Sequence, residues 1–277
     1  MNTMVIGIDI GSTTTKSVAI YPDNSFKTLI TKAFDPITSA TGALGKMLME
    51  NNLQIASVKN IVLTGVGATG IEGNLFGIPT SKIEEIQAVG LGGMYLSGKT
   101  DVVIANLGTG TALVEAHEGR INHIGGTAVG GGTILGLAKA MLNISDLDIL
   151  FKMAAKGRLS QVDLLIGDIT DSDIGFLKKE MTASNFGKLM DSAKDEDIAL
   201  GIFNMVFQVI GTVSAFAAKS RNIKTIVVTG TASDALVGRK SLDAIANMYG
   251  ITFIYPDFPA YATAIGAALS KKSLIKL

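Results

Sequence analysis

A hairpin-like motif near the N-terminus returns 97 positions later, and this repeat restricts the possible folds more than any other feature of the chain. The two copies span residues 5–20 and 102–116, and each places a turn rich in Gly, Ser and Thr between two apolar runs. Gly11 of the first turn corresponds to Gly108 of the second. Apolar runs around such a turn predict β-hairpins. A repeat of this length indicates a duplicated domain rather than a solenoid unit.

The segments that follow each hairpin show a similar order of helices and buried strands. The sequence therefore predicts an α/β fold of two domains that meet at a cleft. Residues 1–98 form the expected first domain, and residues 99–277 form the second, with a helical insertion at about 145–221. The expected elements are helix 38–51, strand 60–64, helix 83–96, helix 133–142, strand 225–228, helix 232–249, strand 251–255 and a closing helix after Pro259.

The composition argues against several classes of function. The chain of 277 residues carries 24 Lys and Arg against 24 Asp and Glu, so a general attraction to nucleic acid or to an anionic membrane is not expected. It contains no cysteine, which excludes disulfides, thiolate zinc sites, a cysteine nucleophile and a cysteine-ligated iron–sulfur cluster. Its two histidines, His117 and His123, lack partners at metal-ligand spacing. A metal site made of protein ligands alone is therefore not expected.

One apolar run, from Ile198 to Ala218, carries no charged residue and is long enough for a transmembrane helix. Within it Asn204 and Gln208 lie on one helical face, no Trp flanks it, and the chain has no second run of this kind. These features favour a buried helix or a subunit-interface helix. The N-terminal residues also lack the pattern of a signal peptide, so a cytoplasmic protein is expected.

The two hairpin turns are the strongest candidates for a ligand site. A tight turn of Gly, Ser and Thr directs backbone N–H groups and hydroxyls to one point, which suits the many acceptor lone pairs of a phosphate. Two such turns facing each other would hold a polyphosphate from both sides. Asp9 would contact phosphate through Mg²⁺ or a water molecule, and Lys16 adds a positive charge nearby.

Other glycine-rich segments compete with the turns. Residues 93–100 fit the P-loop pattern, but the expected helix and strand stand in the wrong order around them. A dinucleotide-type match at 65–70 is interrupted by Gly73 and Pro79, and it is more consistent with a loop whose backbone approaches the cleft. Residues 130–133 lead directly into a helix, whose free N–H groups favour contact with an anion or a substrate.

Several of these stretches resemble known families. The pair 9–16 and 106–111 is similar to the two phosphate loops of the actin, Hsp70 and sugar-kinase superfamily. This resemblance implies a duplicated actin-like (ribonuclease H-like) ATPase fold with ATP in the cleft. Further stretches resemble the type II, eukaryotic-like pantothenate kinases, in order along nearly the whole chain: 64–68, Glu85 in its helix, 126–133, 163–169 and 182–187.

The resemblance implies a role for each candidate residue. Glu85, which position alone would make a solvated first-turn acid, stands where the family has its catalytic base. The family likeness also implies ATP and Mg²⁺ as cofactors, pantothenate as substrate, CoA or an acyl-CoA as a feedback ligand, and a homodimer built on the helices of the insertion. It implies a first ATP loop at Gly11, Ser12, Thr13 and Lys16, a second at Gly108, Thr109, Gly110 and Thr111, further nucleotide contacts at Gly130, Gly131, Gly132, Thr133, Thr229, Gly230 and Thr231, and substrate contacts at Gly65, Gly67 and His123.

Two positions depart from the family pattern. His123 stands where the family has an arginine that helps to bind pantothenate, and Gln87 replaces an aspartate. An imidazole holds a carboxylate less firmly than a guanidinium does. The expected reaction is ATP-dependent phosphorylation of pantothenate to 4'-phosphopantothenate, and the alternative is a non-catalytic or differently specific ATP- or CoA-binding member of the superfamily. The opening residues also resemble activators of 2-hydroxyacyl-CoA dehydratases. Those activators hold a cluster on cysteines, and this chain has no cysteine, so that function is not expected.

Overall fold

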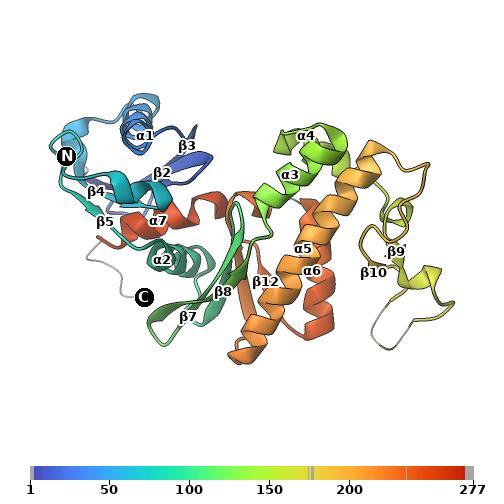
Figure 1. Cartoon of the computed structure of the whole chain (residues 1–277). Helices are drawn as coiled ribbons and strands as arrows, with labels where there is room; N and C mark the ends of the chain where they lie inside the picture. Colours follow the sequence, from blue (N-terminus) through green and yellow to red (C-terminus); the bar gives the residue numbers. More distant parts are fainter. Residues whose placement is uncertain (1–2, 174, 176–177, 235, 272–277) are drawn as a thin grey trace.

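Two five-stranded sheets form the centre of the computed structural model, which describes residues 3–173, 175, 178–234 and 236–271 (Figure 1). The strands of the first sheet are β1 (Met4–Ile10), β2 (Thr14–Ile20), β3 (Phe26–Lys32), β4 (Val58–Thr64) and β5 (Thr80–Lys82). The strands of the second sheet are β6 (Val102–Leu107), β7 (Thr111–His117), β8 (Arg120–Thr127), β11 (Thr225–Thr229) and β12 (Thr252–Ile254).

The two sheets have the same topology. Their strand orders are β3-β2-β1-β4-β5 and β8-β7-β6-β11-β12. In both, the first three strands pair antiparallel and the last two join in parallel. Asp9 pairs with Lys16 across the first hairpin, and Asn106 pairs with Ala112 across the second. The duplication and the two hairpins predicted from the 97-residue repeat are confirmed.

Two helices cover the faces of the first sheet. Helix α1 (Pro36–Glu50) begins after Asp35, whose side chain accepts a hydrogen bond from the Thr38 N–H, and Pro36 suits the first turn. Its Leu44 and Met47 pack on the Ile6 side of β1. Alternate residues of a strand point to opposite faces, and the other face is covered by α7 (Ala262–Leu269), in a cluster that includes Val18, Ile20, Ile265 and Leu269.

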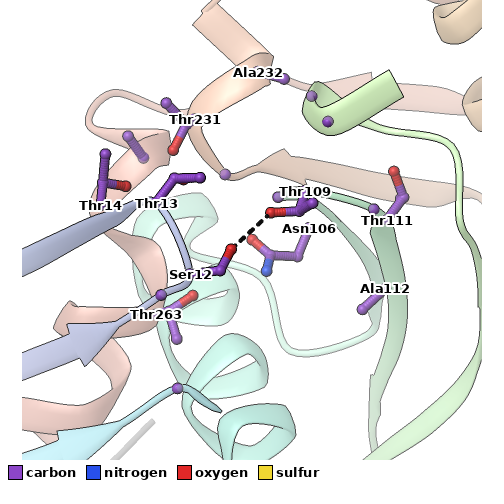
Figure 2. A pocket seen from close by; sticks show the side chains of 18 of the residues that line it. Ser12, Thr13, Thr14, Asn106, Thr109, Thr111, Ala112, Thr231, Ala232 and Thr263 are labelled. Atoms are coloured by element: carbon purple, nitrogen blue, oxygen red, sulfur yellow. Dashed lines mark hydrogen bonds between the residues drawn. The ribbon is translucent and has the colours of Figure 1, made fainter. Parts of the chain in front are cut away.

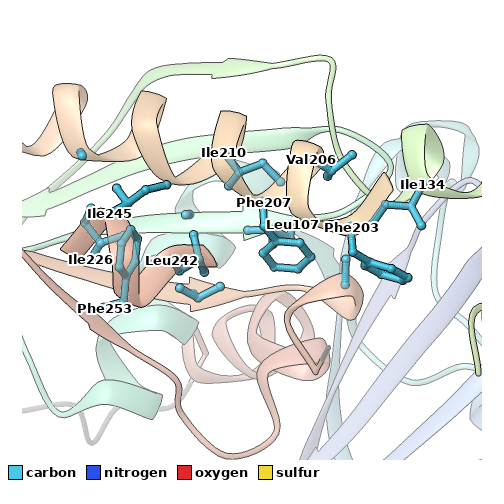
Figure 3. Close-up of a cluster of buried hydrophobic side chains, with 14 of the residues drawn as sticks. Leu107, Ile134, Phe203, Val206, Phe207, Ile210, Ile226, Leu242, Ile245 and Phe253 are labelled. Atoms are coloured by element: carbon cyan, nitrogen blue, oxygen red, sulfur yellow. The ribbon is translucent and has the colours of Figure 1, made fainter. Parts of the chain in front are cut away.

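The second sheet lies between α2 (Glu85–Ser97) on one face and α5 (Asp195–Ser220) on the other. Val89 and Met94 of α2 pack with Val102 and Ile104, whereas α5 packs with the alternate residues Val103 and Leu107. Figure 3 shows Phe203 and Phe207 of α5 beside Leu107. Helices α3 (Gly131–Leu142) and α6 (Leu236–Tyr249) complete this layer.

Helices α2 and α7 each pack on the sheet of the other half of the chain. They cross each other in the middle of the molecule, where glycine permits backbone contact (Figure 1). A Cβ atom on Gly92 would lie 1.8 Å from the Ala262 carbonyl oxygen, and one on Gly266 would lie 1.9 Å from the Ala88 oxygen. The domain boundary at residue 98 therefore stays a prediction. Each half of the sequence supplies one helix, α2 or α7, to the sheet of the other half.

The prediction of a helical insertion at 145–221 is only partly right. Helix α4 (Leu147–Ala154) and helix α5 are present, but between them the described residues form short 3-10 turns and the two-stranded sheet β9 (Leu164–Leu165) and β10 (Thr182–Ser184). The fully buried carboxylate of Asp163 organises this segment. It accepts hydrogen bonds from the Phe186 N–H (2.9 Å), the Thr182 hydroxyl (2.9 Å) and the Asn204 amide (2.7 Å). These contacts join residues 19 to 41 positions apart, which a continuous helix would hold far from one another.

Helix α5 contains the charge-free run. Among the described residues it is the one helix long and apolar enough to cross a membrane, by length and composition only. In the structure 61% of its most apolar stretch is buried, and Phe203 and Phe207 are among the largest fully buried side chains. Asn204 bonds Asp163 and accepts from the Ser241 hydroxyl of α6. The run is therefore accounted for by packing in the core.

Candidate active site

A cleft of about 1180 Å³ separates the two sheets, and both hairpin turns line it. Figure 2 shows Ser12 and Thr109 pointing toward each other, with their hydroxyl oxygens 3.3 Å apart. The backbone N–H of Gly11 donates to the Thr14 carbonyl (3.1 Å), which closes the first turn. The predicted site residues that line the cleft are Asp9, Gly11, Ser12, Thr13, Lys16, Gly65, Glu85, Gly108, Thr109, Gly110, Thr111, His123, Gly131, Gly132, Gly230 and Thr231.

Asp9 is the penultimate residue of β1, two positions before Gly11 of the first turn. Burial raises its pKa to about 6, the nearby Lys16 acts in the opposite direction, and the negative charge of Glu85 raises it further. Lys16 Nζ lies 3.9 Å from Asp9 Oδ2. This separation is too long for the ion pair to outweigh desolvation. Gly65 makes room for the carboxylate, because a Cβ there would lie 2.6 Å from Asp9 Oδ1 and because its φ is +84°.

The surroundings of Asp9 fit a magnesium ion carried by a nucleotide. Mg²⁺ is usually held by one or two carboxylates together with substrate phosphates and waters. In the described part of the chain no group of three or more potential metal ligands exists. A single carboxylate beside the turn therefore fits an ion that also takes phosphate and water ligands. It does not fit a cage made of protein ligands alone.

Asn106 occupies the position equivalent to Asp9 and also lines the cleft. Its side-chain oxygen accepts a hydrogen bond from the Thr229 hydroxyl (3.1 Å), and Thr229 is fully buried. Thr229 was expected beside the nucleotide, but the structure places it behind the cleft wall, where it orients Asn106. The sequence repeat could have identified Asn106 as a cleft residue, because it corresponds to Asp9.

The glycine-rich loop before α3 supports the second turn. The N–H groups of Gly131 and Gly132 donate to the carbonyl oxygens of Gly108 and Thr109, both at 2.9 Å. These two donors are therefore engaged and do not point to an anion, contrary to the expectation of free N–H groups at this helix start. Gly130 and Thr133 do not line the cleft. A Cβ on Gly130 would lie 2.7 Å from the Thr109 oxygen, so this glycine serves close packing of the loop on the turn.

Glu85 and His123 both line the cleft. Glu85 is the first residue of α2 and is exposed, and His123 lies on β8. The Gln87 side-chain amide donates to the Ile121 carbonyl (3.0 Å), which joins the start of α2 to β8. The side chain of Gln87 is therefore engaged within the protein, which the family resemblance did not suggest. Gly67, expected as a substrate contact, lies under Ile10 and does not line the cleft.

Several lining residues carried no sequence signal. They come from elements that approach the cleft only in the folded chain: Lys32 of β3, Val66, Leu135 of α3, residues 145–148 before and in α4, Ala260 in the 3-10 turn before α7, and Thr263 at the start of α7. Thr263 reaches the first turn because α7 crosses back to the first sheet (Figure 2).

Comparisons with known proteins agree with this architecture. The activator of the 2-hydroxyisocaproyl-CoA dehydratase from Clostridium difficile, solved with bound ADPNP, superposes with a TM-score of 0.68 at 20% identity, covering 97% of this chain and 94% of that one. Together with matches to a ROK hexokinase and a ROK family glucokinase, this confirms the predicted actin-like two-domain ATPase fold.

The sequence comparisons are more specific. The Fumble family model matches residues 99–269. A type II pantothenate kinase from Bacillus thuringiensis subsp. konkukian is 30% identical over 235 residues, which cover 82% of each chain. A type II pantothenate kinase from Staphylococcus aureus is 28% identical over 282 residues, covering 97% of this chain and 100% of that one. The chain therefore belongs to the Fumble family, among the type II pantothenate kinases.

Proposed function

We propose that the protein transfers the γ-phosphoryl group of ATP to the primary hydroxyl of pantothenate, the first step of coenzyme A biosynthesis. The observation that carries the proposal is the meeting of two duplicated turns, Ser12 opposite Thr109, in a cleft that Glu85 also lines. The turns bind the triphosphate between them. Family membership supports pantothenate as the acceptor.

The reaction needs positioning and one proton acceptor. The bond between the γ-phosphorus and the bridging oxygen of ADP breaks, and a bond forms between that phosphorus and the hydroxyl oxygen. The hydroxyl proton passes to the carboxylate of Glu85, which acts as general base. Lys16 and the hydroxyls of Ser12 and Thr109 orient the phosphates, and Asp9 would hold Mg²⁺, which supplies charge neutralisation at the phosphate oxygens when bound.

The proposal also covers the other residues of the cleft, the location and oligomeric state of the protein, and a feedback ligand. Gly230, Thr231, Gly65 and His123 line the cleft. In this proposal the first two contact the nucleoside and the last two contact the acceptor. A cytoplasmic homodimer built on the helices of the insertion is part of the proposal. Its support is the family resemblance, and Phe216 of α5, which is 55% exposed, would offer an apolar contact there. CoA or an acyl-CoA as a feedback ligand follows from the family resemblance.

Replacement of Glu85 tests the mechanism. Glu85→Gln should retain ATP binding and lose about 10²-fold or more in turnover, the range for removal of a general base. Glu84→Gln is the matched control, because Glu84 is the exposed neighbour that neither lines the cleft nor caps α2 with its side chain. Turnover should be measured with labelled ATP and pantothenate, and ATP binding by calorimetry. An unchanged turnover in Glu85→Gln would refute the assignment of the base.

The acceptor is tested by the same assay with pantothenate, pantetheine, N-acetylglucosamine and water. Label transferred to pantothenate supports the proposal. Label appearing only in inorganic phosphate would favour the alternative, a nucleotide-switched or CoA-binding protein without transfer to an alcohol. This alternative is kept because His123 and Gln87 differ from the family pattern.

A further inference from the structure

We infer that Thr263, in the first turn of α7, donates a hydrogen bond to the terminal phosphoryl group of the bound nucleotide, so that the cleft distinguishes a nucleoside triphosphate from a diphosphate. The inference rests on the proposed function, because it concerns the nucleotide of that reaction. It adds a contact from outside the two duplicated turns, on a helix that the sequence patterns did not connect with a ligand.

The hydroxyl of Thr263 is a buried polar group at the wall of the cleft. Thr263 is 5% exposed, and it lines the cleft. Within the part of the chain that the structure describes, its side chain makes no hydrogen bond. Figure 2 shows this side chain directed toward Ser12 of the first turn. A buried hydroxyl without a hydrogen bond is costly, so the geometry favours a ligand of the cleft as its partner.

The packing of α7 on β1 places Thr263 on the same face of the sheet as Asp9. A Cβ on Gly7 would lie 2.0 Å from the Ala264 carbonyl oxygen, so α7 contacts the face toward which residue 7 points. Alternate residues of a strand share a face, and Asp9 follows Gly7 by two positions with no register shift against β2. Ile8 points the other way, into the cluster under α1. Asp9 and Thr263 are therefore both on the α7 side of the sheet.

The direction of α7 brings its first turn to the cleft. Thr263 lines the cleft, whereas Leu269, the last residue of the helix, packs with Val18 and Ile20 in the core. The helix therefore runs away from the cleft, and the positive end of its dipole is directed at the ligand. This end of a helix stabilises a negative charge.

The groups around Asp9 identify the part of the nucleotide that Thr263 meets. Lys16 Nζ lies 3.9 Å from Asp9 Oδ2, and Glu85 is close enough for its negative charge to raise the pKa of Asp9. In the proposed reaction Glu85 takes the proton of the acceptor hydroxyl, whose oxygen attacks the terminal phosphorus. The terminal phosphoryl group therefore belongs on the side of the cleft where Asp9 and Glu85 interact, which is the side of Thr263.

The terminal phosphoryl group needs hydrogen-bond donors in these surroundings. The carboxylates of Asp9 and Glu85 repel its oxygens, and Lys16 offsets part of that repulsion. A hydroxyl that donates to a charged oxygen forms a charge-assisted hydrogen bond, which is stronger than a bond between neutral groups. Loss of the Thr263 hydroxyl should therefore weaken the binding of a triphosphate and not of a diphosphate, which lacks the terminal group.

The experiment measures the dissociation constants of ADPNP, a non-hydrolysable triphosphate, and of ADP, both with Mg²⁺, by calorimetry. Thr263→Val keeps a side chain of similar size and removes the hydroxyl. It should weaken ADPNP binding by about tenfold or more, the size for a hydrogen bond to a charged group, and leave ADP binding unchanged. Thr263→Ser retains a hydroxyl and should restore the affinity for ADPNP.

Thr15→Val is the matched control. Thr15 lies on β2 beside the first turn and is fully buried, and its hydroxyl has no hydrogen-bond partner among the described residues. Unlike Thr263, Thr15 does not line the cleft. Thr15→Val should bind both nucleotides as the unmodified protein does. Thermal melts without nucleotide should show both valine variants at least as stable as the unmodified protein, because neither hydroxyl bonds a described residue.

Three outcomes would overturn the inference. The first is an equal loss of affinity for ADPNP and ADP in Thr263→Val, which would assign the hydroxyl to a part of the nucleotide that both share. The second is an unchanged affinity for ADPNP in this variant; a raised KM for pantothenate would then assign the hydroxyl to the acceptor. The third is a Thr263→Ser variant that melts as the unmodified protein does and yet binds ADPNP as weakly as Thr263→Val.

A transfer assay with labelled ATP separates this inference from the proposed function. If the affinities change as expected but no alcohol takes label in the unmodified protein, the proposed function is refuted and the contact of Thr263 stands. If the unmodified protein binds neither nucleotide, both are refuted.

Discussion

The crossing of α2 and α7 predicts that a single methyl group destabilises the protein. A Cβ on Gly92 would lie 1.8 Å from the Ala262 carbonyl oxygen and 2.5 Å from its carbon. Real Cβ contacts are essentially never shorter than 3.0 Å. Both partner atoms belong to the backbone, so no side chain can rotate away. The Gly92→Ala variant must therefore separate the two helices by more than an ångström.

The expected loss follows from two opposing effects. Overpacking costs about 1–3 kcal/mol, and the upper end applies here because a backbone must move. Alanine is favoured over glycine inside a helix by about 0.8–1.0 kcal/mol, so the net loss in the free energy of unfolding is about 2 kcal/mol. Gly42→Ala in α1 is the matched control. Gly42 is exposed, and a Cβ at this position would meet no atom within 4 Å, so this variant should gain about 0.5–1 kcal/mol.

Urea unfolding followed by circular dichroism measures both changes. The midpoints should rank Gly42→Ala above the unmodified protein and Gly92→Ala below it. ATP affinity should also fall in Gly92→Ala, because Thr263 at the start of α7 lines the cleft. A Gly92→Ala midpoint equal to or above that of the unmodified protein would refute the close crossing of α2 and α7.

Two further substitutions test buried carboxylates. Burial raises the pKa of Asp9 to about 6 from 3.8, so the folded protein binds this proton more tightly than the unfolded chain and loses stability as the pH rises through this window. Thermal unfolding should therefore show Asp9→Asn more stable than the unmodified protein at pH 8 without Mg²⁺, by about 3 kcal/mol in the free energy of unfolding, while transfer is abolished. The gain should shrink as the pH falls from 6 towards 3.8, and equal stability at pH 8 would contradict the cause given for the shift. Asp163→Asn places an amide N–H₂ group against the N–H and hydroxyl groups that now donate to Asp163, and it should lower the free energy of unfolding in urea by about 2–3 kcal/mol. Asp191→Asn is its control, because Asp191 is exposed in the same segment. Equal midpoints for the two variants would refute the structural role of Asp163.

Much of the fold could be predicted from local patterns. The strands of both hairpins, the helix at 36–50 and the helix at 85–97 follow from apolar periodicity and from turn residues within a few positions of each other. The prediction failed in the described part of 155–194, where the backbone is held by Asp163 and partners up to 41 positions away in the sequence. Periodicity carries no information about such contacts.

The sequence alone determined the duplicated turns, and with them the kind of ligand that the cleft suits, because a turn's donors lie within a few residues and need no distant partner. Only the tertiary structure decided which residues reach the cleft. Thr263 arrives through the crossing of α7 at Gly92, Thr229 is placed behind Asn106, and the N–H groups of Gly131 and Gly132 are engaged by the second turn. These positions depend on which surfaces pack together, and packing is a property of the whole chain.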